Sequence, residues 1–205
     1  NVSLFDGRGG EYSAELTDVK KGAARAKVGL FVDTDRESPL KIELAIGISR
    51  GERMDWIVQK ATELGVTGIT PLFTARCEVK LNAERLGKKT RHWQQVGVSA
   101  CEQCQRNTLP VIQPAVSLEQ YLSTANEGLK LVLHHRSSQR LDEMRNQNNQ
   151  VAILVGPEGG LSEREISLAI SANFASLAIG PRVLRTETAP LAAISIIQSL
   201  WGDMG

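Results

Sequence analysis

LAIGPRVLRTETAPLAA, residues 177–193, joins an apolar run typical of a β-strand to one typical of a helix. Between the two runs it places two arginines, two threonines and a glutamate. Gly180 is expected to end the strand, and Thr188 is expected to cap the helix, which Pro190 helps to start. A purely structural connection needs only a few residues, so the length and charge of this loop predict that it folds over a ligand.

Upstream of this stretch, apolar runs alternate with segments whose apolar residues recur at helical spacing. Strands are expected at residues 42–48, 68–74, 130–135, 151–156 and 174–180. Helices are expected at residues 54–64, 83–104 and 191–201, with a further one after residue 162. Continuous apolar strands that alternate with helices are typical of a parallel sheet covered on both faces. The fold class predicted for this part of the chain is therefore α/β.

The first 35 residues differ from the rest. Residues 11–19 alternate apolar and polar side chains, and residues 26–32 form a second strand-like run, so a small antiparallel β unit is expected. The polar segment 33–39 then serves as a linker. Because the chain begins with Asn1 inside this pattern, the natural protein is expected to be longer at this end.

The composition is that of a globular protein with a substantial core, since 41% of the 205 residues are hydrophobic. The apolar runs are much shorter than the ~20 residues that cross a bilayer, so a cytoplasmic location without membrane contact is expected. Cys101 and Cys104 form a close pair, but no second Cys or His pair lies at ligand spacing, so no metal site is expected. With a net charge of +1, contact with nucleic acid requires a local basic patch.

Unusual residues lie at the ends of three of the expected strands, at positions 133–135, 155–166 and 179–189. Ligands of parallel sheets bind at the carboxyl ends of the strands, so these segments are the candidate site. In the second segment, GPEGG lets the backbone turn sharply, and Ser162 with Glu165 forms a capping box. No Lys-Ser or Lys-Thr follows the glycines and their spacing is not G-x-G-x-x-G, which argues against a phosphate loop. A tight turn without a ligand is the alternative.

Four ordered motifs carry a resemblance to a known family. They are QKATELGVTGITPLFTARC at 59–77, ACEQCQRN at 100–107, ILVGPEGGLSEREI at 153–166 and LAIGPRVLRTETAPLAAISIIQ at 177–198. With them the chain resembles the RsmE-type methyltransferases, which methylate N3 of a uracil in bacterial 16S ribosomal RNA. The resemblance implies a SPOUT parallel sheet with a C-terminal trefoil knot at residues 36–205, preceded by an incomplete, RNA-binding PUA-like β-barrel at residues 1–35. It also implies a homodimer, S-adenosylmethionine as cofactor and the small ribosomal subunit as partner.

The same resemblance implies which residues form the site. The turns after three strands are expected to converge on the cofactor, which contacts Leu133, His134, Gly156, Gly160, Ile179, Gly180, Leu184, Arg185, Thr186, Thr188 and Ala189. Methylation of N3 requires loss of the imide proton, so Arg185 is expected to stabilise the anion and Glu187 is a candidate proton acceptor. An ion pair of Glu187 with Arg182 or Arg185 that merely shapes the loop is the alternative. No metal is required, because the sulfonium already activates the methyl group.

Further residues are expected to contact the RNA substrate, namely Arg50, Arg53, Glu102, Gln103 and Arg106. For the last three, which lie at a helix end, the dimer interface is the alternative. His92 and Trp93 lie beside basic residues and have two interpretations, an RNA contact or a solvated helix face with Trp93 in the core. The last helix carries an apolar stripe that is expected to pack on the sheet, and its other face is expected to meet a second subunit. Two other functions stay open: methylation of a ribose 2′-hydroxyl or another base, and RNA binding in ribosome assembly without a cofactor.

Overall fold

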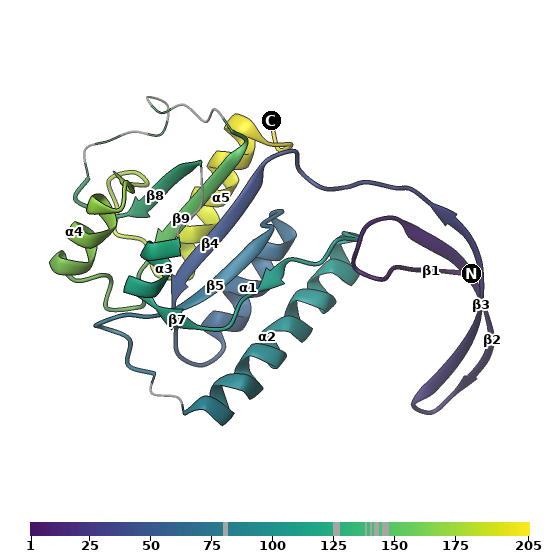
Figure 1. Ribbon diagram of the computed structural model, residues 1–205. Coiled ribbons are helices and arrows are strands. Elements are labelled where there is room, and N and C mark those ends of the chain that lie inside the picture. Colours follow the sequence, from purple (N-terminus) through teal and green to yellow (C-terminus); the bar gives the residue numbers. More distant parts are fainter. Residues whose placement is uncertain (80–81, 125–127, 138, 140, 142–143, 145–147) are drawn as a thin grey trace.

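The computed structural model describes residues 1–205 apart from 80–81, 125–127, 138, 140, 142–143 and 145–147, and its strands form two sheets (Figure 1). The antiparallel sheet, ordered β1-β2-β3, contains β1 (Val2–Leu4), β2 (Glu11–Lys20) and β3 (Ala23–Val32). The seven-stranded sheet is ordered β10-β8-β9-β4-β5-β6, and β7 also pairs with β5. Its strands are β4 (Lys41–Gly47), β5 (Gly68–Phe73), β6 (Val111–Ile112), β7 (Val116–Ser117), β8 (Leu129–Leu133), β9 (Gln150–Val155) and β10 (Ala175–Leu177). All of their pairings are parallel.

Helices cover both faces of the larger sheet, as predicted. They are α1 (Arg53–Glu63), α2 (Ala83–Cys104), α3 (Leu118–Thr124), α4 (Glu163–Ser171) and α5 (Thr188–Trp201). The buried side chains form two clusters, one with α1, α5 and Trp93 of α2, the other with α3 and α4. Successive strand residues point to opposite faces, so Ile153 of β9 joins the first cluster and Leu154 the second. The continuous apolar runs of the central strands are explained by this double burial.

Several predicted boundaries are confirmed. Helix α2 begins and ends at the predicted residues, 83 and 104. Helix α1 ends just before Gly65, whose φ of 83° is the left-handed conformation that commonly follows a helix C-terminus. Helix α4 begins with the predicted capping box, in which Ser162 and Glu165 each accept a bond from the backbone N–H of the other.

The polar stretch before α5 differs from expectation. Strand β10 ends at Leu177, so the loop that follows is longer than predicted. The prediction that Thr188 caps α5 was wrong, because Thr188 is the first helical residue and Glu187 holds the cap position without a side-chain cap bond. Instead the carbonyl of Arg185 accepts from the N–H groups of Thr188 and Ala189, both at 2.9 Å, and this winds the chain into the helix. Elements β6, β7 and α3 were not predicted.

The antiparallel unit expected at the start of the chain is present and arches away from the larger sheet (Figure 1). Strand β3 is exposed along its whole length, while Tyr12 of β2 packs its ring 5.1 Å from that of Phe31. The linker to β4 is tied to the main body where Asn107 donates its amide to the carbonyl of Thr34 at 2.5 Å. Among the described residues, no helix is long and apolar enough to cross a membrane.

Candidate active site

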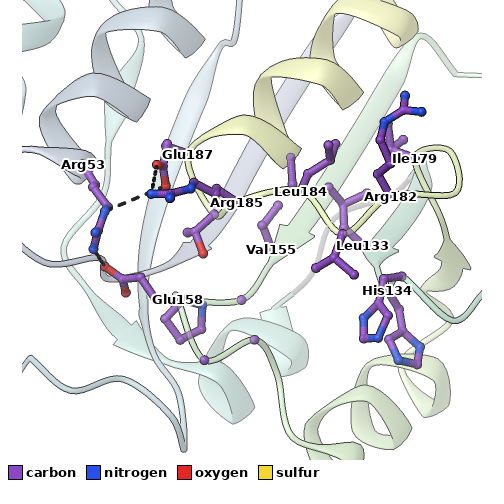
Figure 2. Close-up of a pocket in the computed structure, with 18 of the residues that line it drawn as sticks. Arg53, Leu133, His134, Val155, Glu158, Ile179, Arg182, Leu184, Arg185 and Glu187 are labelled. Carbon is purple, nitrogen blue, oxygen red and sulfur yellow. Dashed lines mark hydrogen bonds and ion pairs between the residues drawn. The ribbon is translucent and has the colours of Figure 1, made fainter.

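A cavity of about 430 Å³ lies where β8, β9 and β10 end (Figure 2). Its walls come from the segments that follow these strands and from Arg53 at the start of α1. Its volume lies within the roughly 300–1,000 Å³ of small-molecule sites. Of the predicted cofactor contacts, all except Gly180 and Thr188 line it. Lining residues that were not predicted include His135, Val155, Pro157 and Gly159, each of which adjoins a predicted one in the sequence.

The Gly-rich turn after β9 forms the side of the cavity that faces the neighbouring strand β4. Gly160 donates its N–H to the carbonyl of Pro157 at 2.7 Å and has a φ of 68°, which favours glycine. The turn lies directly against the end of β4, where a Cβ added to Gly47 would come within 2.5 Å of Pro157. Glycine at position 47 is therefore what allows the turn to cross the end of β4.

Apolar side chains from three separate segments form one wall. Figure 2 shows Leu133 at the end of β8, Val155 at the end of β9 and Leu184 in the last loop pointing toward one another. Val155 is buried, whereas Leu133 and Leu184 are partly exposed to the cavity. A flat apolar group therefore has a seat here, with the backbone groups of the glycine turn beside it.

Four charged residues gather at the other end of the cavity (Figure 2). Arg53 donates Nη1 to Glu158 Oε1 at 2.9 Å, and its Nε lies 4.0 Å from Glu187 Oε2. Arg185 Nη1 also lies 4.0 Å from Glu187, and the Arg185 side chain is 79% exposed. Glu187 is thus shared loosely between two guanidinium groups, and Arg185 projects toward solvent at the rim.

The carboxylate of Glu158 is held in its charged form. Partial burial alone would raise its pKa, but hydrogen bonds from the backbone N–H of Arg50 and from the Arg53 guanidinium outweigh this and lower the pKa. Arg53, predicted to contact RNA, therefore acts within the cavity as the ionic partner of Glu158. Arg50, also in the predicted RNA set, is exposed and pairs with Glu78.

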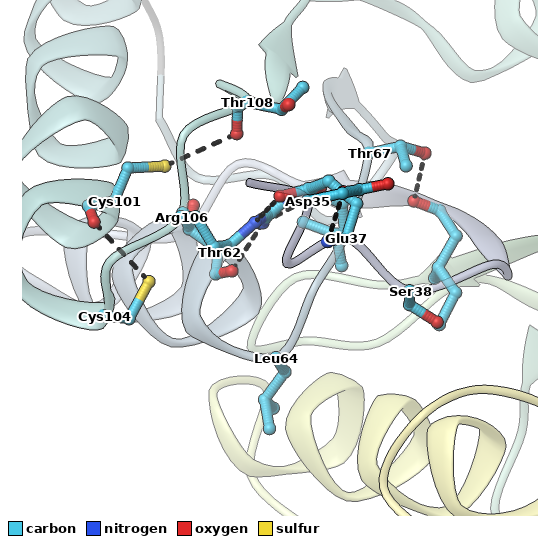
Figure 3. A network of polar contacts seen from close by, with 12 residues as sticks. Asp35, Glu37, Ser38, Thr62, Leu64, Thr67, Cys101, Cys104, Arg106 and Thr108 are labelled. Atoms are coloured by element: carbon cyan, nitrogen blue, oxygen red, sulfur yellow. Dashed lines mark hydrogen bonds and ion pairs between the residues drawn. The ribbon is translucent and has the colours of Figure 1, made fainter. Parts of the chain in front are cut away.

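Arg106 is not placed to contact RNA, and this prediction is corrected. It is 5% exposed, and its guanidinium donates to both carboxylate oxygens of Glu37 and to the carbonyls of Thr62 and Val66 (Figure 3). Burial by itself would lower the Arg106 pKa, but the hydrogen bonds and charge of Glu37 raise it above its ordinary value. Arg106 thus joins the linker before β4 to the end of α1.

The neighbours of Arg106 in the predicted RNA set, Glu102 and Gln103, are exposed. They lie at the end of α2 beside the antiparallel unit, away from the cavity at the strand ends (Figure 1). Glu102 lines a separate cavity of about 470 Å³ together with residues of the N-terminal segment. The structure therefore does not bring these two residues together with Arg53 and Arg185.

Other residues with two interpretations are now placed. Trp93 is buried and donates its indole N–H to Asp55 at 3.1 Å, while His92 Nε2 lies 2.7 Å from the second Asp55 oxygen, so the core interpretation is confirmed. Cys101 is buried, and burial raises its pKa to about 11. In the described part of the chain, no group of three or more His, Cys, Asp or Glu residues is placed to hold a metal.

Comparison with known proteins identifies the family. A model of the RNA methyltransferase domain matches residues 36–198. The ribosomal RNA small subunit methyltransferase E of Buchnera aphidicola (subspecies Schizaphis graminum) is 40% identical over 169 residues, which cover 82% of this chain and 69% of that protein. The chain belongs to the ribosomal RNA small subunit methyltransferase E family. The Bacillus subtilis member is 34% identical over 198 residues, covering 92% of this chain and 77% of its own. The resemblance predicted from the four motifs is confirmed.

Solved structures agree with this family assignment. The methyltransferase E of Neisseria gonorrhoeae, bound to S-adenosylmethionine, superposes with a TM-score of 0.95 at 43% identity and covers 100% of this chain and 85% of its own. A Legionella pneumophila protein with the same bound cofactor also gives a TM-score of 0.95, at 45% identity, covering 98% of this chain and 83% of its own. Both relatives thus hold the cofactor that the family resemblance of this chain implies.

Proposed function

We propose that this chain transfers a methyl group from S-adenosylmethionine to N3 of a uridine in 16S ribosomal RNA of the small ribosomal subunit. The observation that carries the proposal is the convergence of three strand-end segments on one cavity, with exposed Arg185 at its rim. Membership of the methyltransferase E family supports the reaction class, and the two relatives solved with cofactor support its methyl donor.

The residues of the cavity fit this cofactor. Leu133, Ile179 and Leu184 offer an apolar seat for the adenine ring, and the N–H and C=O groups of the glycine turn offer partners for its polar edge. A Cβ added to Gly160 would meet nothing within 4 Å. There is therefore open space next to the backbone of this turn, in which a ligand can approach it. When bound, S-adenosylmethionine supplies a methyl group already activated by its sulfonium.

The reacting nitrogen of uracil carries a weakly acidic proton that must leave. Arg185 is permanently charged and presents a planar fork of N–H donors, which suits the two carbonyl oxygens that flank N3 and stabilises the developing anion. Glu187, beside Arg185, accepts the proton. The alternative is that the Arg185–Glu187 pair only shapes the loop, and the 4.0 Å separation of the two groups favours the catalytic assignment because a tight pair would occupy Arg185.

The same proposal includes the finer architecture of the family. Residues 36–205 form a SPOUT domain whose C-terminal segments make a trefoil knot, and residues 1–35 are part of a PUA-like barrel that holds RNA together with Arg50, Glu102 and Gln103. Two chains pair through α5, whose outward residues Ile196 and Leu200 are 41% and 48% exposed. The enzyme works in the cytoplasm, where ribosomal subunits are assembled. A monomer in sedimentation at micromolar concentration would contradict the dimer.

One experiment separates the proposed function from the two alternatives. Labelled S-adenosylmethionine is incubated with the chain and with small subunits that lack the modification, and the labelled nucleoside is identified by mass spectrometry. The proposal expects 3-methyluridine. A 2′-O-methylated nucleoside or another methylated base would assign a different acceptor. No labelled nucleoside, together with no cofactor binding in calorimetry as a companion measurement, would leave an RNA-binding protein without methyltransferase activity.

A further inference from the structure

The Gly-rich turn of the cavity is held from outside by the loop that follows β5. In the sheet, β4 lies between β5 and β9, so contact between the ends of β5 and β9 has to pass across the end of β4. Gly47 ends β4 in direct contact with the turn and leaves room for this crossing. Residues 74–77, which follow β5, thus contact residues 159–165, which follow β9, across the end of β4.

Glu165 provides the first half of the connection. One of its carboxylate oxygens accepts the backbone N–H of Ala75 at 2.7 Å. The other accepts the N–H of Ser162 at 2.7 Å and its hydroxyl at 2.9 Å. Glu165 is only 5% exposed and lies in the first turn of α4. Both carboxylate oxygens are therefore committed to fixing the chain.

Arg76 provides the second half in the opposite direction. Its guanidinium donates Nη1 to the carbonyl of Gly159 at 2.9 Å and to that of Leu161 at 3.3 Å. Its side-chain stem packs on the turn, since a Cβ added to Gly159 would lie 3.0 Å from the Cβ of Arg76. An exposed arginine thus binds two backbone carbonyls of the segment whose other side lines the cavity.

We propose that Arg76 and Glu165 are positioning residues, which hold the turn at residues 156–160 in the shape that binds the cofactor. This inference rests on the proposed function. Neither side chain lines the cavity, so both act through the turn. A glycine-rich segment loses much conformational freedom when it is ordered, and fixing it before the ligand arrives removes that cost from binding.

The first test compares Arg76→Ala with Arg76→Lys in the full chain. Arg76→Ala is expected to raise the Kd and KM for S-adenosylmethionine about tenfold, equivalent to about 1.4 kcal/mol. The kcat at saturating cofactor is expected to stay within about threefold, because the turn still closes once the cofactor is bound. Arg76→Lys keeps a cationic donor and is expected to recover part of the affinity. The matched control is Arg164→Ala, which removes an exposed arginine next to Glu165 and is expected to leave Kd unchanged.

A second variant tests the buried half. Glu165→Gln keeps the shape but replaces one acceptor by an amide N–H₂, which then faces a backbone N–H, so the same loss of cofactor affinity is expected with the fold retained in circular dichroism. If the unchanged chain fails to bind S-adenosylmethionine in calorimetry, the proposed function itself fails. If the unchanged chain binds and Arg76→Ala binds within twofold of it, the positioning role is wrong. Equal losses in Arg76→Ala and Arg164→Ala would also overturn it, since they would reduce the effect to net charge.

Discussion

Replacing Arg106 with alanine is expected to lower the free energy of unfolding by about 3–5 kcal/mol, the usual cost of breaking a buried ion pair. The lost contacts are a two-bond pair with Glu37 and bonds to the carbonyls of Thr62 and Val66 at 2.6 and 3.2 Å. Each hydrogen bond to a charged group is worth about 1.5–3 kcal/mol, but such terms are not additive. Because the Glu37 side chain is 19% exposed, water replaces part of the loss, and the total stays in the stated range.

The assay is urea unfolding at pH 7 followed by tryptophan fluorescence, with free energies from linear extrapolation. The matched control is Arg36→Ala, which removes an arginine whose pair with Glu11 is more exposed and 3.3 Å long. This control is expected to cost less than about 1 kcal/mol. When Glu37 has already been replaced with alanine, the pair is broken before Arg106 is changed. The loss of unfolding free energy caused by Arg106→Ala is then expected to be about 0.5–3 kcal/mol smaller than in the unchanged chain.

Two results would refute the reasoning. A loss below about 1 kcal/mol for Arg106→Ala, no larger than that of an ordinary surface change, would mean that the buried pair contributes little. A drop of about one in the salt slope of RNA binding, with stability unchanged, would mean that Arg106 contacts a phosphate in solution. The buried position predicts an unchanged slope in the folded variant.

Two substitutions and one chemical probe test the site and the core further. Arg185→Ala is expected to keep the Kd for S-adenosylmethionine within about twofold and to lower single-turnover methylation by about 10²–10³, the usual loss of one anion-stabilising donor; full activity would remove its catalytic role. Gly47→Ala places a Cβ 2.5 Å from the turn after β9, so a loss of about 1–3 kcal/mol in urea unfolding and weaker cofactor binding are expected. The control Gly87→Ala, inside α2, is expected to stabilise slightly. Cys101, with its pKa raised from 9.0 to about 11, is expected to hold about a hundredfold less thiolate at pH 8 than an ordinary cysteine and to resist iodoacetamide in mapping by mass spectrometry. The stability linked to this thiol is complete below pH 9 and is lost as the pH rises toward 11, so a flat unfolding free energy over that window would contradict the raised pKa.

The long elements were predictable because their patterns are repeated often enough to be read. Strands β4 and β9 are apolar at consecutive positions, which only a sheet buried on both faces requires, and α2 carries helical periodicity over 22 residues. Strands β6 and β7 contain two residues each, which is too short for any periodicity. The sheet extends into this region only because β5 offers a pairing edge, and that is a tertiary effect.

The candidate site was predictable where the local chemistry was unusual for its position. The glycines after β9 and the charged loop before α5 departed from what a plain connection needs, and both line the cavity. The partner of a charge was not predictable in the same way. Glu37 and Arg106 are 69 residues apart in the sequence. No local signal distinguishes a buried arginine from a surface one. The capping box predicted one contact of Glu165, but its bond to Ala75 arises only from strand order.

The strand order also dictates when the enzyme becomes competent during its synthesis. Strand β4 is synthesised early, but one of its two neighbours in the sheet is β9. The pairing of Lys41 with Gln150 can therefore form only after β9 has been made. A growing chain that ends before β9 leaves one edge of the buried strand β4 unpaired, which is an aggregation hazard that chaperones commonly cover. The cavity is complete only after Ala189 has left the ribosome. Nascent fragments that end before this residue therefore lack the complete cavity, and any ligand bound there reports a chain that has folded through the final loop.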